Sequence, residues 1–216
     1  HALCCAMYSA VKTGDVVLSA TGPAYDTLMN TITGDMAGSM KQYGIGYRQV
    51  EMKNGLPDVP AIAEAAKAED VKLVFIQRSK GYGVRESLSC EQIGEVCQAV
   101  RAVNKDAVIM VDNCYGEFVE KLEPTQVGAD IIAGSLIKNP GGGLAPTGGR
   151  ECFVPSDGAG HRRGVRLHDG TEPPAVSGSV YGTAYDCTGR QDRRVRRTGH
   201  ADDGIRSTSA AGRSAP

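Results

Sequence analysis

Residues 107–112 read AVIMVD, a run of five apolar residues that ends in one acid. The run shows no alternation of apolar and polar residues. A continuous apolar run of this kind is typical of a strand that is buried on both faces. Asp112 is therefore expected at the end of a buried strand.

The same pattern recurs along the first 149 residues. Strands are predicted at residues 16–20, 44–52, 72–77, 107–112 and 129–135, and helices at residues 1–11, 25–32, 59–67 and 90–104. Asp58 is the expected N-cap of the helix that begins after it. The alternation of helices with continuous apolar strands predicts an α/β fold, a mostly parallel sheet flanked by helices on both faces.

Composition limits the class of protein. The chain has 216 residues, of which 41% are hydrophobic and 23% charged, and its net charge of -1 gives no reason to expect nucleic acid or a membrane as partner. No apolar run approaches the roughly 20 residues that cross a bilayer. An odd number of cysteines, in a chain too long to need a disulfide scaffold, favours a reduced, cytoplasmic protein. The seven cysteines contain no C-x-x-C pair, so no metal site is predicted. Cys90, Cys97 and Cys114 are interpreted as small core residues.

The character of the chain changes after Gly149. Every lysine lies at or before Lys138, whereas most arginines lie at or after Arg150, and no run of four apolar residues follows. We interpret residues 1–149 as a large domain and residues 150–216 as an aberrant, disordered tail, as a change of reading frame would produce. A genuine disordered extension and a basic nucleic-acid-binding arm are the alternatives.

Four polar side chains follow the predicted strands. Asp112 ends one strand, Ser135 ends the next, and Lys138 comes three residues later, while Tyr25 follows the first strand. In parallel sheets, ligands bind beyond the carboxyl ends of the strands. The four side chains are therefore expected to line one crevice.

An aldehyde cofactor, pyridoxal phosphate, would use all four residues. Lys138 could form a Schiff base, and partial burial would lower its pKa as that reaction requires. Asp112 could hold a proton on the pyridine nitrogen, and Tyr25 could stack on the ring. Ser135 and exposed backbone N–H groups could hold the phosphate, and the glycines at 141–143 would let backbone or cofactor approach closely.

Each residue also has an ordinary interpretation. Asp112 could be a turn former, Lys138 a solvated cation, Tyr25 a core residue and Ser135 a local backbone partner. Their joint spacing favours the cofactor site. The sequence lacks the P-loop pattern and a Rossmann fingerprint. A non-enzymatic phosphate- or nucleotide-binding α/β module stays open as the alternative.

Two long motifs carry a family resemblance, VIMVDNCYGEF at 108–118 and GADIIAGSLIKNPGGGLAPTGG at 128–149. They resemble the fold-type-I pyridoxal-phosphate enzymes of cysteine and methionine metabolism, and in particular the methionine gamma-lyase family or aluminium resistance protein branch. Residues 14–28 and 43–52 are similar to the same branch. The resemblance implies the large domain of the aspartate aminotransferase fold.

The resemblance also implies roles for residues. Lys138 would be the Schiff-base lysine, Asp112 the partner of the pyridine nitrogen, Ser135 a phosphate contact and Tyr25 the stacking ring. The reaction would be β- or γ-elimination from a sulfur-containing amino acid, by a protein that is a homo-oligomer at full length.

The chain departs from the family in three places. No asparagine follows the strand at 72–77, where Gln77, Arg78 or Ser79 could replace it. The family's Gly-Thr phosphate turn would precede His1, and residues 150–216 do not match the smaller C-terminal domain. We therefore expect a chain truncated at both ends, with weak cofactor binding and impaired turnover.

Overall fold

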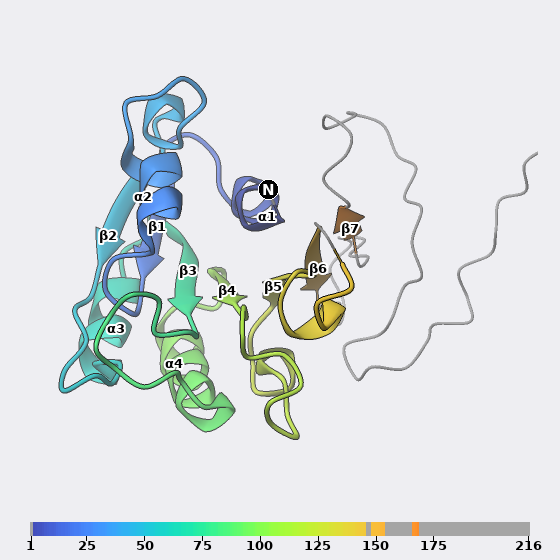
Figure 1. Ribbon diagram of the computed structural model, residues 1–216. Coiled ribbons are helices and arrows are strands. Elements are labelled where there is room, and N and C mark those ends of the chain that lie inside the picture. Colours follow the sequence, from blue (N-terminus) through green and yellow to red (C-terminus); the bar gives the residue numbers. More distant parts are fainter. Residues whose placement is uncertain (1, 146–147, 154–165, 169–216) are drawn as a thin grey trace, which may run out of the picture.

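The computed structural model describes residues 2–145, 148–153 and 166–168, which form one sheet and the helices around it (Figure 1). The helices are α1 (Ala2–Ala10), α2 (Asp26–Thr33), α3 (Val59–Ala66) and α4 (Cys90–Val103), with short 3-10 helices η1 (Lys41–Tyr43), η2 (Pro124–Gln126) and η3 (Asn139–Gly141). The strands are β1 (Val16–Ser19), β2 (Gly46–Gln49), β3 (Val71–Gln77), β4 (Val108–Asp112), β5 (Ile131–Ser135), β6 (Gly149–Phe153) and β7 (Arg166–His168).

The sheet has the order β2-β1-β3-β4-β5-β6-β7. Strands β2, β1, β3, β4 and β5 pair in parallel, whereas β6 and β7 add in antiparallel fashion. The predicted α/β class with a mostly parallel sheet is confirmed. The sheet also continues past the predicted boundary at residue 149, because β6 begins there and pairs with β5. Apart from β6 and β7, the predicted tail lies outside the described residues.

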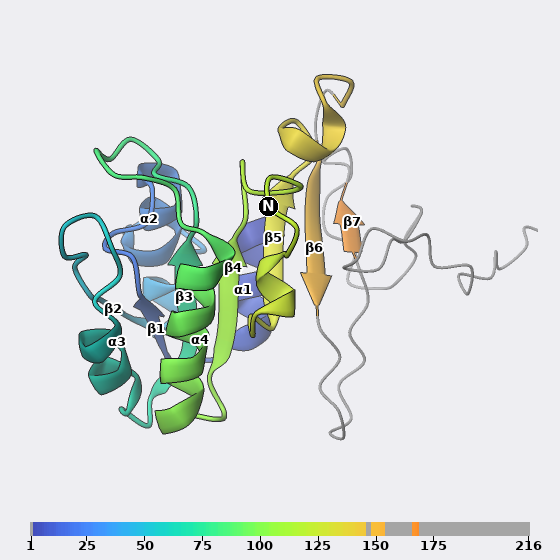
Figure 2. The ribbon, with the colours of Figure 1, turned by 90° about the horizontal axis from the view of Figure 1, so that it is seen from below.

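Both faces of the sheet carry a hydrophobic core, which explains the continuous apolar runs. In β3, Val74 and Ile76 pack on one face and Leu73 and Phe75 on the other, and all four are fully buried. Residues of α3 and α4 belong to the first core, and residues of α1 and α2 to the second. Figure 2 shows the strands between these helices.

Local signals set the helix starts. Asp58 accepts a hydrogen bond from the N–H of Ala61 at 3.3 Å, which confirms it as the N-cap of α3. Ser89 and Gln92 form a capping box at the start of α4. Strand β2 is shorter than the predicted 44–52 because, at the edge of the sheet, it pairs with β1, whose four residues match Gly46–Gln49.

Within the described part of the chain, no helix has both the length and the apolar character needed to cross a membrane.

Candidate functional site

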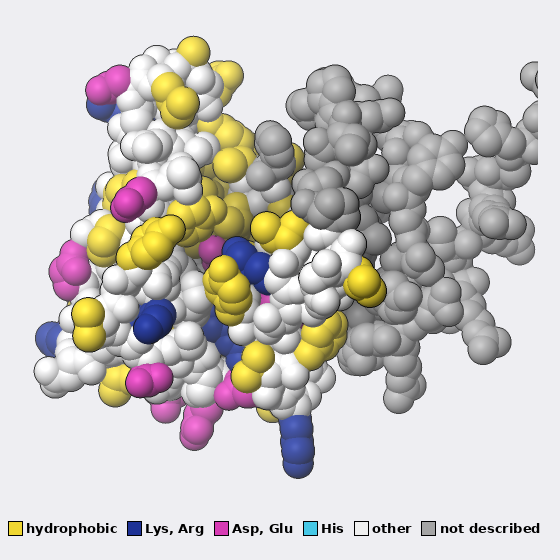
Figure 3. Space-filling model, viewed as in Figure 1, with side chains coloured by type: hydrophobic (Ala, Val, Ile, Leu, Met, Phe, Trp, Pro, Cys, Tyr) yellow, Lys and Arg dark blue, Asp and Glu magenta, His cyan; other side chains and the backbone are white. Residues whose placement is uncertain are grey.

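The carboxyl ends of the parallel strands bring the predicted residues to one edge of the sheet. Gln77 at the end of β3 lies beside Asp112 at the end of β4, and Asp112 lies beside Ala133 of β5. Lys138 follows β5 as the residue that precedes η3. On this face of the molecule, basic side chains lie among hydrophobic ones between β3 and β5 (Figure 3).

Asp112 is a buried carboxylate, with only 3% of its surface exposed. Its Oδ1 atom accepts a hydrogen bond from the N–H of Cys114 at 3.1 Å. Burial raises the pKa of Asp112, and the hydrogen bonds from Cys114 and the positive charge of Lys138 offset only part of that increase. The charges of Asp112 and Lys138 therefore influence each other across the ends of β4 and β5.

Lys138 is half-buried, and its backbone N–H donates to the carbonyl oxygen of Ser135 at 3.2 Å. Its Nζ atom lies 4.7 Å from the centre of the Tyr115 ring. Burial alone lowers the pKa of Lys138, but Cys114, Tyr115 and Asp112 together outweigh burial and raise it. The expected lowering of this pKa was wrong, because the anion-forming groups on the loop after β4 were not visible as neighbours in the sequence.

Cys114 is buried, as predicted, but it is more than a core residue. Burial, followed by the charge of Asp112, raises the pKa of the Cys114 thiol to about 12, while Lys138 acts in the opposite direction. The thiol is therefore protonated at neutral pH and lies in the same environment as the acid and the amine. One feature of the sequence could have indicated that Cys114 lies beside Asp112 and Lys138: it follows the strand-end acid Asp112 by two residues.

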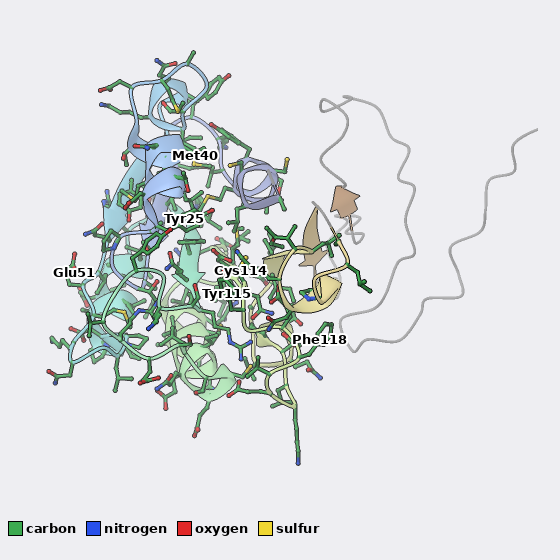
Figure 4. The ribbon with its side chains drawn as sticks, viewed as in Figure 1. Tyr25, Met40, Glu51, Cys114, Tyr115 and Phe118 are labelled. Atoms are coloured by element: carbon green, nitrogen blue, oxygen red, sulfur yellow. The ribbon has the colours of Figure 1, made fainter. Side chains whose placement is uncertain are left out.

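Tyr25 lies at the start of α2 and is half-buried. Burial, then Asp112 and Cys114, raise the pKa of its hydroxyl to about 12. Its backbone N–H donates to Oε1 of Gln77 at 3.1 Å. Figure 4 shows Tyr25 beside α2, whereas Cys114 and Tyr115 lie in the loop after β4. The charge of Asp112 reaches the Tyr25 hydroxyl from the end of β4.

Ser135 ends β5 and is half-buried, beside Gly149 of β6. Its carbonyl oxygen holds the backbone of Lys138. The role of its hydroxyl toward a phosphate stays a prediction.

The side chains of Arg78 and Gln77 make hydrogen bonds to other groups of the protein. The Arg78 side chain is 3% exposed and donates to the carbonyl oxygens of Leu88 and Gly116 and to the side chains of Asn113 and Glu120. These bonds occupy the guanidinium, so Arg78 is a poor replacement for the missing asparagine.

Gln77 is occupied in a similar way. Its side chain accepts from the N–H of Tyr25 and donates to the carbonyl oxygen of Ser79 at 3.3 Å. Its backbone N–H donates to Oγ1 of Thr21 at 3.0 Å. Gln77 therefore joins the ends of β1 and β3 and holds Tyr25 in place, a contact that no sequence pattern revealed.

The loop after β4 is braced from several sides. Glu123 accepts from the side chain of Asn113 and from the backbone N–H of Phe118, each at 2.8 Å. Within this loop Tyr115 and Phe118 have positive φ angles of 67° and 63°. Left-handed backbone is rare for aromatic residues and persists where the surroundings impose it.

The arrangement brings an amine, a buried carboxylate, a protonated thiol and two aromatic rings together. An amine can condense with a carbonyl, an acid can hold a proton, and a ring can stack on a planar ligand. The chemistry of this set suits a planar, carbonyl-bearing molecule.

Comparison with known proteins gives consistent results. The profile of the family described as Methionine gamma-lyase matches residues 1–154. An uncharacterized protein of Bacillus subtilis (strain 168), YnbB, is 41% identical over 208 residues, which cover 86% of this chain and 49% of YnbB. That share of the chain exceeds residues 1–154, so the similarity reaches into the segment interpreted as a tail.

Two solved structures are similar in fold and sequence. A protein from Clostridium acetobutylicum, provisionally named cystathionine beta-lyase involved in aluminum resistance, has a TM-score of 0.68 and 47% identity, covering 70% of this chain and 37% of that chain. A protein from Listeria monocytogenes with the same provisional name has a TM-score of 0.68 and 44% identity, covering 71% and 39%. The predicted fold-type-I large domain is confirmed. The chain spans about half the length of YnbB and less than two fifths of each solved structure.

Proposed function

Because the chain belongs to the methionine gamma-lyase family, we propose that it carries the pyridoxal-phosphate site of a carbon–sulfur lyase. The names of its relatives support the reaction class. The observation that carries the proposal is the placement of Asp112 at the end of β4, beside β5, with the Lys138 ammonium after β5 near enough to act on its charge.

The residues present fit this cofactor. Pyridoxal phosphate requires an amine for its aldehyde, an acid for its ring nitrogen and a flat surface for its ring. Lys138, Asp112 and Tyr25 supply these groups in one environment. When bound, the cofactor supplies an electron-accepting ring that stabilises a carbanion at the α carbon of an amino acid.

The protein's own groups then have defined tasks. Lys138 would hold the aldehyde and later move the α proton of the substrate, which requires its ammonium to lose a proton first. Asp112 would hold a proton at the ring nitrogen, and that cation would in turn favour the ionised carboxylate. Tyr25 would stack with its hydroxyl protonated, because its pKa is about 12. Ser135 would contact the phosphate.

We propose a sulfur-containing amino acid as substrate, with elimination at the β or γ carbon. The provisional names of the Clostridium and Listeria relatives, which refer to cystathionine, support this substrate class. We also propose that the full-length protein is a homo-oligomer.

Trapping the cofactor tests the site directly. The 216-residue chain would be incubated with pyridoxal phosphate, reduced with borohydride, digested and mapped by mass spectrometry. We expect one dominant modified peptide, carrying the cofactor on Lys138, and a visible absorbance before reduction.

Two variants make the test specific. Lys138→Ala should abolish the dominant adduct, whereas Lys105→Ala should leave it intact because Lys105 is exposed and follows the far end of α4. Modification spread over many surface lysines, unchanged by Lys138→Ala, would refute the proposal and favour the phosphate-binding module.

A further inference from the structure

We infer that Tyr115 is a positioning residue for Lys138, and that its ring holds the amine as an ammonium ion while the amine has no carbonyl partner. The inference extends the proposed function, on which the role of Lys138 rests. It concerns a residue that lies outside the four predicted from the strand ends.

The contact itself is a cation–π geometry. The Nζ atom of Lys138 lies 4.7 Å from the centre of the Tyr115 ring. Cations within about 6 Å of a ring centroid are attracted by the negative face of the ring. The ring therefore stabilises the charged form of the amine.

The backbone keeps the ring in this place. Tyr115 has a φ of 67°, a conformation that few bulky residues adopt. The turn around it is held at both ends, because the N–H of Asn113 donates to the carbonyl oxygen of Ala133 and the N–H of Gly116 donates to that of Asn113, each at 2.8 Å. Arg78 holds the carbonyl oxygen of Gly116 at 2.9 Å. The left-handed residue is thus imposed by its neighbours rather than by its own preference.

Among the residues that the structure describes, three titratable groups act on Lys138, namely Asp112, Cys114 and Tyr115. Asp112 and Cys114 are buried, whereas Tyr115 is 62% exposed. The Tyr115 ring is therefore the one neighbour that can be removed with little loss of packing. Removal of the whole side chain, compared with removal of its hydroxyl alone, isolates the contribution of the ring to the charge on Lys138.

The contact has a chemical consequence. The nitrogen of Lys138 can attack a carbonyl carbon only after the ammonium has released one proton to solvent, and the condensation then releases one water molecule. A ring that stabilises the ammonium lowers the fraction of Lys138 that is a neutral amine. It also holds the Lys138 side chain in one orientation. Loss of the ring should make the amine neutral at lower pH.

The test measures the titration of Lys138 without any cofactor. The 216-residue chain would be acetylated briefly with acetic anhydride across the alkaline pH range in which circular dichroism shows it folded, and the Lys138 peptide would be quantified by mass spectrometry. A change in access to the amine alters the rate at high pH, whereas a change in pKa moves the midpoint. The midpoint is therefore the decisive readout.

Matched variants separate the ring from the hydroxyl and from the backbone. In Tyr115→Asn, whose new residue tolerates left-handed backbone, the midpoint should fall by about half a pH unit, equivalent to about three-fold more neutral amine below it. Tyr115→Phe keeps the ring and removes only the ionisable hydroxyl, so its midpoint should fall less than that of Tyr115→Asn. Phe118→Asn is the control, because Phe118 shares the left-handed φ and the 62% exposure, while the ring that faces Lys138 is that of Tyr115.

An unchanged midpoint in Tyr115→Asn would overturn the inference, and so would a Tyr115→Phe midpoint that falls as far as that of Tyr115→Asn. Neither result depends on pyridoxal phosphate. A failure of the proposed function would appear separately, as the absence of a cofactor adduct on Lys138.

Discussion

Replacement of Arg78 by methionine should destabilise the whole domain. The Arg78 side chain is 3% exposed and donates to Leu88 at 3.1 Å, Asn113 at 2.8 Å, Gly116 at 2.9 Å and Glu120 at 2.9 Å. Methionine would fill much of the space but remove the donor from all four acceptors, of which Glu120 would keep the N–H of Cys90 and Gly116 that of Val119. Removal of one partner from a buried charged network costs about 3–5 kcal/mol of the free energy of unfolding.

That loss is large compared with the total stability of a domain, about 5–15 kcal/mol. For a urea dependence of about 2 kcal/mol per molar, it corresponds to a fall of about 2 M in the unfolding midpoint. Urea titration followed by circular dichroism measures the midpoint for both proteins. Arg78→Lys, which keeps the charge but loses the planar fork, should lie between them.

Arg48→Met provides the control. Arg48 makes two hydrogen bonds to Asp70, at 2.9 Å and 2.6 Å, but its side chain is 47% exposed. Solvent screens such a pair, so its loss should move the midpoint far less. Equal midpoints for Arg78→Met and Arg48→Met would refute the view that Arg78 braces the loop after β4.

Two further predictions concern the acid and the thiol. Because burial raises the pKa of Asp112, the stability that its carboxyl contributes is full below the ordinary pKa of an aspartate and is lost as the pH rises from that value through the folded-state pKa. Asp112→Asn should therefore melt at a higher temperature than the wild type at pH 7 without cofactor. This gain should vanish in acid below the ordinary pKa of an aspartate, where the native carboxyl is protonated in both states. Differential scanning fluorimetry at the two pH values checks the sign, and a gain that persists in acid would contradict it. Cys114, which is buried with a pKa of about 12, should react with a thiol reagent at pH 8 far more slowly than the exposed Cys5, as peptide mapping after timed alkylation would show; equal rates would count against a protonated thiol beside Lys138.

The strands were predictable because their pattern follows from burial on both faces. Val74 and Ile76 point to one core and Leu73 and Phe75 to the other, so a strand between two helical layers must be apolar throughout. The antiparallel strands β6 and β7 were not predicted. They lie beyond the last run of four apolar residues, and they join the sheet because β6 pairs with β5 and β7 pairs with β6.

The gathering of Asp112, Lys138 and Tyr25 was also predictable, because the carboxyl ends of neighbouring parallel strands meet at one edge. Their roles toward a cofactor, and that of Ser135, stay predictions. The direction of the Lys138 pKa was not predictable. It depends on Cys114 and Tyr115, which a braced loop brings to the amine from another part of the chain.

Apolar periodicity and the strand-end positions of a few polar residues were thus enough to indicate the α/β architecture and the location of the site, since both follow from local order along the chain. The folded protein was needed to find the hydrogen bonds of Arg78 and Gln77. It was also needed for the left-handed backbone of Tyr115 and for the balance of charges around Lys138. Hydrogen bonds and electrostatic interactions depend on distances between segments far apart in the chain, and only tertiary packing sets those distances.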